Sequence, residues 1–145
     1  MSSTVDVNLL VYWTAEDSPF HEPSAALMED LTRGPDLLYV FWPVLMSYLR
    51  LVTHPGIVDE PLSLEEALEN VESLVSLAHV RTPGEEPDFL GVFRSALPGP
   101  IRGNDVPDAH LVALMRQHGV ASIYTNDRGF RRFDKIRVID PFASP

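Results

Sequence analysis

The chain has 145 residues, of which 45% are hydrophobic, so it is long enough to form one domain around its own core. Cysteine is absent, which excludes disulfides, thiolate metal sites and a cysteine nucleophile. The net charge of −10 argues against a general nucleic-acid-binding protein. No apolar stretch is long enough to cross a membrane, and the N-terminus lacks the basic region of a signal peptide. We therefore expect a cytoplasmic protein with no membrane partner.

The charge is distributed unevenly along the chain. Residues 1–100 carry four arginines against sixteen acids, a balance of −12, whereas residues 101–145 carry seven bases against five acids, a balance of +2. Five of these bases fall within ten positions: Arg128, Arg131, Arg132, Lys135 and Arg137. Such a basic patch can contact phosphates, although a solvated charged face is the simpler explanation when no other observation bears on it.

Strands and helices alternate along the predicted fold. In chain order, the first half is expected to hold a strand, or a strand running into a helix, over Val5–Val11, a helix over 18–31, a strand over Leu37–Phe41, and helices over Pro43–Val52 and Leu64–Ala78. The second half is expected to hold a short strand near Val80, a helix over Pro87–Leu97, a helix from Asn104 or Asp105 to His118, a strand over Ser122–Tyr124, a helical turn over Arg128–Phe133 and a strand over Ile136–Ile139. This order predicts an α/β fold with a mostly parallel sheet between helical layers.

Three aspartates stand apart from the other acids. Asp6 lies in an apolar segment, Asp108 lies in the first turns of a predicted helix, and Asp127 follows a predicted strand. If they meet at the carboxyl edge of the sheet, each raises the pKa of the others, and a hard divalent cation such as Mg²⁺ would neutralise them. A cation held in this way assists phosphodiester hydrolysis. Taken singly, the three have simpler explanations: a helix cap, a favourable charge at a helix N-terminus, and a turn residue.

Four segments, in order, resemble the motifs of VapC-type PIN domains. They are Asp6-Val-Asn8-Leu-Leu-Val-Tyr12, Leu49-Arg50-Leu51-Val52-Thr53-His54-Pro55, 103–111 with Asn104 and Asp108, and Thr125-Asn126-Asp127-Arg128-Gly129-Phe130, and Asp140-Pro141 matches a common ending. The resemblance implies one PIN-like domain over residues 1–145, built as a three-layer α/β/α sandwich. It also implies that the first strand ends near Asp6 and that a helix starts at Asn8.

The resemblance further implies an endoribonuclease that acts as the toxin of a VapBC-type toxin–antitoxin system. Its metal and catalytic residues would be Asp6, Asp108 and Asp127, which would hold Mg²⁺, with Mn²⁺ as the alternative ion. Residues expected to line the site or bind RNA are Asn8, Arg50, Asn104, Thr125, Arg128, Arg131 and Arg132. Arg50 has an equally good explanation as a structural partner of an acid. The expected partners are a VapB-like antitoxin, the RNA substrate and a second copy in a homodimer.

One position departs from the family pattern. Ser47 stands where PIN domains usually carry a glutamate in the second motif. Three carboxylates instead of four should weaken metal binding. Asp105 has two explanations, as an acid that compensates in part or as a helix cap or solvated loop residue. The alternative function is therefore a PIN-like module with weak or no activity that acts through partner or RNA binding. A phosphatase with Asp6 as nucleophile is a third possibility, disfavoured by Asn8 in place of a second aspartate.

Overall fold

The computed structural model describes residues 1–143 and has a five-stranded sheet at its centre. The strands are β1 (Ser2–Val5), β2 (Leu37–Tyr39), β3 (Val80–Arg81), β4 (Ser122–Tyr124) and β5 (Arg137–Ile139). Their spatial order is β3-β2-β1-β4-β5, and every neighbouring pair is parallel. Because all strands run the same way, the residues that follow them emerge at one edge. The predicted parallel α/β fold is confirmed.

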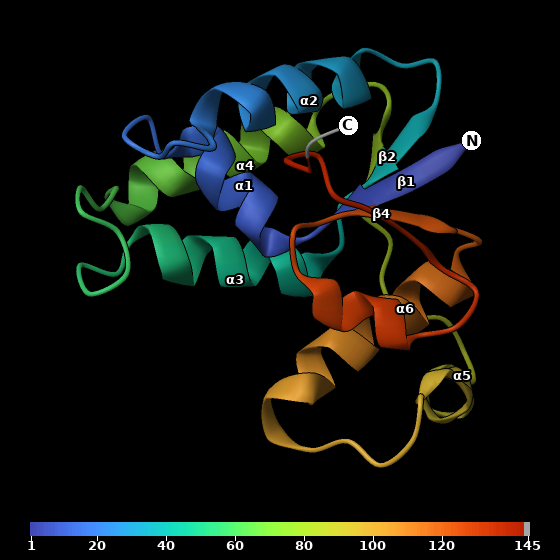
Figure 1. Ribbon diagram of the computed structural model, residues 1–145. Coiled ribbons are helices and arrows are strands. Elements are labelled where there is room, and N and C mark those ends of the chain that lie inside the picture. The colour runs from blue at the N-terminus through green and yellow to red at the C-terminus, as the bar shows by residue number, and fades with distance from the viewer. Residues whose placement is uncertain (144–145) are drawn as a thin grey trace.

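Helices enclose this sheet. They are α1 (Val7–Thr14), α2 (His21–Arg33), α3 (Trp42–Val52), α4 (Leu64–Val75), α5 (Phe89–Ala96) and α6 (Val106–Gln117), with short 3₁₀ turns η1 (Gly103–Asp105) and η2 (Arg128–Arg132). Figure 1 shows α1 and α2 on one side of the strands and α5 and α6 on the other, with each of these pairs in contact. Within residues 1–143, every helix is too short or too polar to cross a lipid bilayer.

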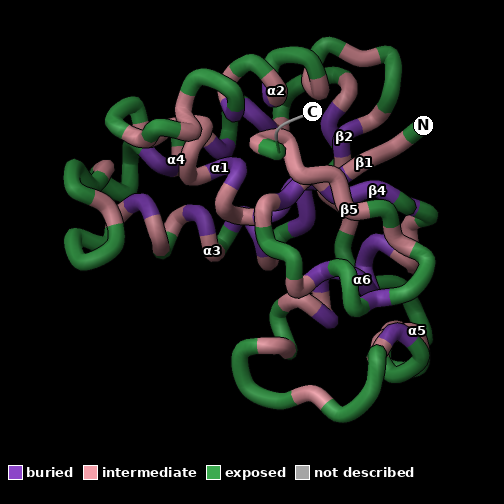
Figure 2. The backbone as a smooth tube through the Cα atoms, in the orientation of Figure 1, coloured by how far each residue is buried: buried purple, intermediate pink, exposed green. Residues whose placement is uncertain are grey.

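The core lies between the sheet and the helices. Figure 2 shows buried backbone along the central strands and on the inner sides of the helices. Val5 on β1, Leu38 on β2, Ile123 on β4 and Val112 on α6 are completely buried. Polar residues of these strands, such as Thr4 and Ser122, are buried as well, because helices cover both faces of the sheet. Burial of this kind makes the sheet edge a rigid support for the side chains that follow the strands.

The structure decides two predicted boundaries. For Val5–Val11, the sequence predicts a strand or a strand running into a helix, and the second is found: β1 ends at Val5 and α1 follows, as the family resemblance implied. The helix expected to begin at Ser18-Pro19 begins at His21, because the Ser18 hydroxyl accepts the Phe20 N–H at 3.1 Å and closes a separate turn. In contrast, the helix expected from Leu64 begins at that residue, where Ser63 and Glu66 form a capping box.

Candidate active site

Asp6 is the first residue after β1 and the N-cap of α1. Its Oδ1 accepts the Val7 N–H at 2.7 Å, its Oδ2 accepts the Thr125 hydroxyl at 3.0 Å, and the residue is only 8% exposed. Burial raises the pKa of this carboxyl, the two hydrogen bonds oppose that rise, and the charge of Asp127 adds to it. Asp6 is therefore both the helix cap and a buried acid beside a second acid.

Thr125 joins Asp6 to Asp127. Strands β1 and β4 are paired with Val5 opposite Tyr124, so Asp6 and Thr125 leave the sheet side by side. The Thr125 hydroxyl donates to Asp6 and accepts the Asp127 N–H at 2.9 Å. Asp127 in turn caps η2, because its Oδ1 accepts the Gly129 N–H at 2.8 Å. One buried threonine thus orients both acids.

Asp108 lies in the first turn of α6, with 24% of its side chain exposed. Its pKa is raised to about 6, first by burial and then by the charges of Asp127, Asp6 and Asp105, against the opposing charge of Arg132. Charges raise the pKa of a carboxylate to this extent only when they lie a short distance from it. The three predicted aspartates, from distant parts of the sequence, therefore form one electrostatic cluster.

Arg132 reaches into this cluster from η2. Its guanidinium pairs with Asp105 through Nη1 at 3.2 Å and with Asp108 through Nη2 at 3.3 Å. It also lies 5.1 Å from the centre of the Phe133 ring. The sequence suggested an RNA contact for Arg132, but in the structure its guanidinium faces acids. Asp105 occupies the N-cap position of α6, but its side chain makes no capping hydrogen bond.

The donor chemistry of the cluster fits a hard divalent cation, because its ligands would be carboxylate oxygens. In residues 1–143, however, no three acidic or imidazole side chains are already arranged to hold a metal ion. The carboxylates instead accept hydrogen bonds within the protein: Asp6 from Val7 and Thr125, Asp127 from Gly129, and Asp108 from Arg132. Their charges still act on one another and raise the pKa values of Asp6 and Asp108.

The other predicted residues differ in exposure. Asn8 is half-buried in the first turn of α1, whereas Asn104, in η1, is exposed. Arg128 and Arg131 are exposed on η2, next to Asp127. Arg50 is exposed on the last turn of α3, about two turns from the start of that helix, and none of the ion pairs found in residues 1–143 involves it.

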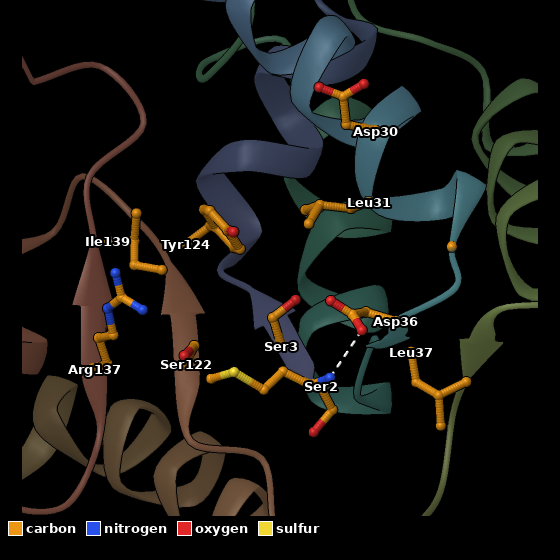
Figure 3. A pocket seen from close by; sticks show the side chains of 12 residues that line it. Ser2, Ser3, Asp30, Leu31, Asp36, Leu37, Ser122, Tyr124, Arg137 and Ile139 are labelled. Carbon is orange, nitrogen blue, oxygen red and sulfur yellow. Dashed lines mark hydrogen bonds and ion pairs between the residues drawn. The ribbon is translucent and has the colours of Figure 1, made fainter.

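Ser47 lies on α3 and is half-buried. The acids that raise the pKa of Asp108 are Asp127, Asp6 and Asp105. None of them lies on α3. A separate hollow, shown in Figure 3, runs along β1, β4 and β5, from Ser2, Ser122 and Arg137 at their amino ends to Tyr124 and Ile139. None of the three aspartates lines it.

The chain is similar to known proteins over nearly its whole length. The sequence-family model of the PIN domain matches residues 4–136. Ribonuclease VapC48 of Mycobacterium tuberculosis is 51% identical over 144 residues, which are 99% of each chain. Ribonuclease VapC43 of the same organism is 33% identical over 92% of this chain and 90% of its own.

Two solved structures share the fold at low sequence identity. One is VapC20 of M. tuberculosis, described as a toxin that cleaves the sarcin–ricin loop, with a TM-score of 0.67, 17% identity and coverage of 93% of this chain and 98% of its own. The other is VapBC2 of Rickettsia felis bound to promoter DNA, with a TM-score of 0.68, 13% identity and coverage of 96% and 98%. Taken with the sequence matches, these findings show that the chain belongs to the PIN-domain family and, within it, to the VapC group.

Proposed function

We propose that the protein is a divalent-cation-dependent endoribonuclease and the toxin of a VapBC-type pair. The observation that carries the proposal is the cluster of Asp6, Asp108 and Asp127 at the carboxyl edge of the sheet, where the charge of one acid raises the pKa of another. The names of the VapC48 and VapC43 relatives support ribonuclease activity, and their similarity extends over nearly the whole chain.

Each aspartate would serve the site in a defined way. Asp6, Asp108 and Asp127 would hold Mg²⁺, or Mn²⁺, through carboxylate oxygens. When bound, the ion would activate water and stabilise negative charge on the phosphodiester. Thr125 would keep Asp6 and Asp127 in register, because its hydroxyl touches both. Asn8 and Asn104, which flank Asp6 and Asp108 in the sequence, would offer amide groups to the RNA.

Exposed bases next to Asp127 would bind the RNA backbone. Arg128 and Arg131 extend from η2 into solvent, where they can approach phosphates without losing a partner in the fold. This local positive surface would offset the repulsion between RNA and a protein of net charge −10. Arg50 lies farther along α3 and would contact only a longer RNA.

The two other functions considered have less support. A phosphatase with Asp6 as nucleophile would ordinarily have a second aspartate at position 8, where this chain has Asn8. A binding-only module was suggested by Ser47. The ribonuclease names of relatives that match almost end to end favour an enzyme instead.

A basic segment of a VapB-like antitoxin would suit the acidic side of the molecule. Three hollows with shared residues adjoin the end of α1, and apolar side chains such as Trp13, Val58 and Leu62 line them. The acids that border them are Glu16, Asp17, Asp59, Glu60, Glu66 and Glu69. An apolar floor with an acidic rim is complementary to an amphipathic basic peptide.

A homodimer would cover apolar side chains on α3. Trp42 and Met46 are one helical turn apart and are 43% and 50% exposed. Large apolar side chains on one face of a helix are typical of a protein–protein contact. Sedimentation analysis of the protein and of Met46→Lys would test whether this face is the one buried.

RNA cleavage tests the proposal. Purified protein should cut RNA with Mg²⁺ and lose that activity when the ion is chelated. Asp6→Asn should cut at least about a hundredfold more slowly, because the ion would lose a charged ligand. Asp36→Asn, which changes an exposed acid paired with the N-terminus, is the matched control and should cut normally. Equal rates for wild type and Asp6→Asn would reject the assignment.

A further inference from the structure

A positive charge of the protein already occupies part of the acidic cluster. The guanidinium of Arg132 is shared between Asp105 Oδ1 and Asp108 Oδ2, and the Phe133 ring lies beside it. About a third of the Arg132 side chain is exposed, so the group sits at the rim of the cluster and has a path back to solvent. A guanidinium in such a position neutralises acids as a metal ion would, but with hydrogen bonds.

Gly129 lies near both Asp127 and the same guanidinium. A Cβ atom at residue 129 would lie 3.0 Å from Asp127 Oδ1 and 3.9 Å from Arg132 Nη1. The absence of a side chain at residue 129 leaves this space open. Of the three acids assigned to the cation, Arg132 is paired with Asp108, and Asp105 extends its contacts outward.

We propose that Arg132 is an internal counter-ion that competes with the divalent cation for Asp108, and that Asp105 holds the released guanidinium at the edge of the site. This inference rests on the proposed function, because it presumes that the cluster takes up a cation. The guanidinium 3.3 Å from Asp108 Oδ2 and an ion on the same carboxylate repel each other and share one negative charge, so each weakens the binding of the other. Asp105 is one turn away, so the arginine needs only a small movement to keep one partner.

Calorimetric titration of Mn²⁺ at pH 8 into the chelator-treated protein tests the competition. Arg132→Gln should bind the ion about three- to tenfold more tightly, as expected when a unit charge is removed from a partly solvated site a few ångströms away. Arg131→Gln is the matched control, because it removes the same charge from the same turn. None of the ion pairs within residues 1–143 involves Arg131, so its affinity for Mn²⁺ should change less than twofold.

Asp105→Asn separates an indirect role of this acid from a direct one. In the wild-type background the substitution should weaken Mn²⁺ binding, because the guanidinium loses its second partner and stays on Asp108. In the Arg132→Gln background, Asp105→Asn should weaken Mn²⁺ binding by less than half of its effect in the wild-type background, because no guanidinium is present for Asp105 to hold. Equal weakening in both backgrounds would make Asp105 a ligand in its own right and overturn its assigned role.

The thermal unfolding of the same variants gives a second readout that does not depend on RNA cleavage. Arg132→Gln should have a lower Tm than wild type without a cation and a larger rise in Tm when Mn²⁺ is added. If wild type binds Mn²⁺ and cleaves RNA but Arg132→Gln binds no more tightly, the inference fails alone. If no variant binds the ion and wild type does not cleave RNA, the proposed function fails as well.

Discussion

Asp108 should destabilise the cation-free protein, and neutralising it should make the fold more stable. Its folded-state pKa is raised from 3.8 to about 6, and one pKa unit corresponds to about 1.4 kcal/mol, so the ionised carboxylate costs at most about 3 kcal/mol. Its side chain is 24% exposed, and solvent screening lowers this cost to about 1–2 kcal/mol. Asp108→Asn should raise the free energy of unfolding by that amount at pH 8.

The stability difference between Asp108→Asn and wild type should depend on pH. Because the pKa of Asp108 is higher in the folded than in the unfolded protein, the folded state holds the proton more tightly. The cost of ionisation is absent below about pH 3.8, grows as the pH rises and is complete above about pH 6. The stability difference between Asp108→Asn and wild type should therefore be large at pH 8 and nearly absent at pH 4.

Urea unfolding in the presence of a chelator measures this difference. Asp59→Asn, which neutralises an exposed acid on the other side of the molecule, is the control and should behave like wild type at both pH values. Added Mg²⁺ should stabilise wild type more than Asp108→Asn, because the variant offers the ion a weaker ligand. The reasoning is refuted if Asp108→Asn is no more stable than wild type at pH 8, or if its advantage persists at pH 4.

Two further predictions concern the residues around the acids. Thr125→Val should lower the free energy of unfolding by about 1–3 kcal/mol in urea, because the Asp6 carboxylate and the Asp127 N–H both lose a hydrogen-bond partner; Thr125→Ser should retain most of the stability. Arg128→Gln should weaken RNA binding by a similar factor for all RNA sequences, as measured by fluorescence anisotropy. It should also reduce the slope of log binding constant against log salt concentration by about one. Arg33→Gln, on α2 and paired with Glu29, should leave RNA binding unchanged; an equal loss would argue against η2 as the RNA-binding surface.

The sequence pattern was sufficient for the sheet but not for every boundary. Short apolar strands followed by helices predicted a parallel sheet, and pairing of β1 with β4 then placed Asp6 beside Thr125. The segment Val5–Val11 left a strand and a strand running into a helix open, because Leu9 and Leu10, fully buried in α1, make the same apolar run that a buried strand makes. The start of α2 was missed because serine before proline closes a turn as readily as it caps a helix.

The acids were easier to identify than their partners. Asp6, Asp108 and Asp127 each had a local explanation, and only the fold brings their charges together. Arg132 looked like the other arginines of the basic cluster, because nothing in its own neighbourhood of the sequence indicates Asp105 and Asp108, more than twenty positions earlier. Tertiary ion pairs of this kind depend on chain packing and leave no periodic signal.

A crystal structure with Mn²⁺, using the anomalous scattering of the ion, tests the central claim most directly. We expect a peak about 2 Å from carboxylate oxygens of Asp6, Asp108 and Asp127, with the Arg132 guanidinium withdrawn from Asp108. A structure at saturating Mn²⁺ with no peak among these three side chains, or with the ion bound only elsewhere, would contradict it.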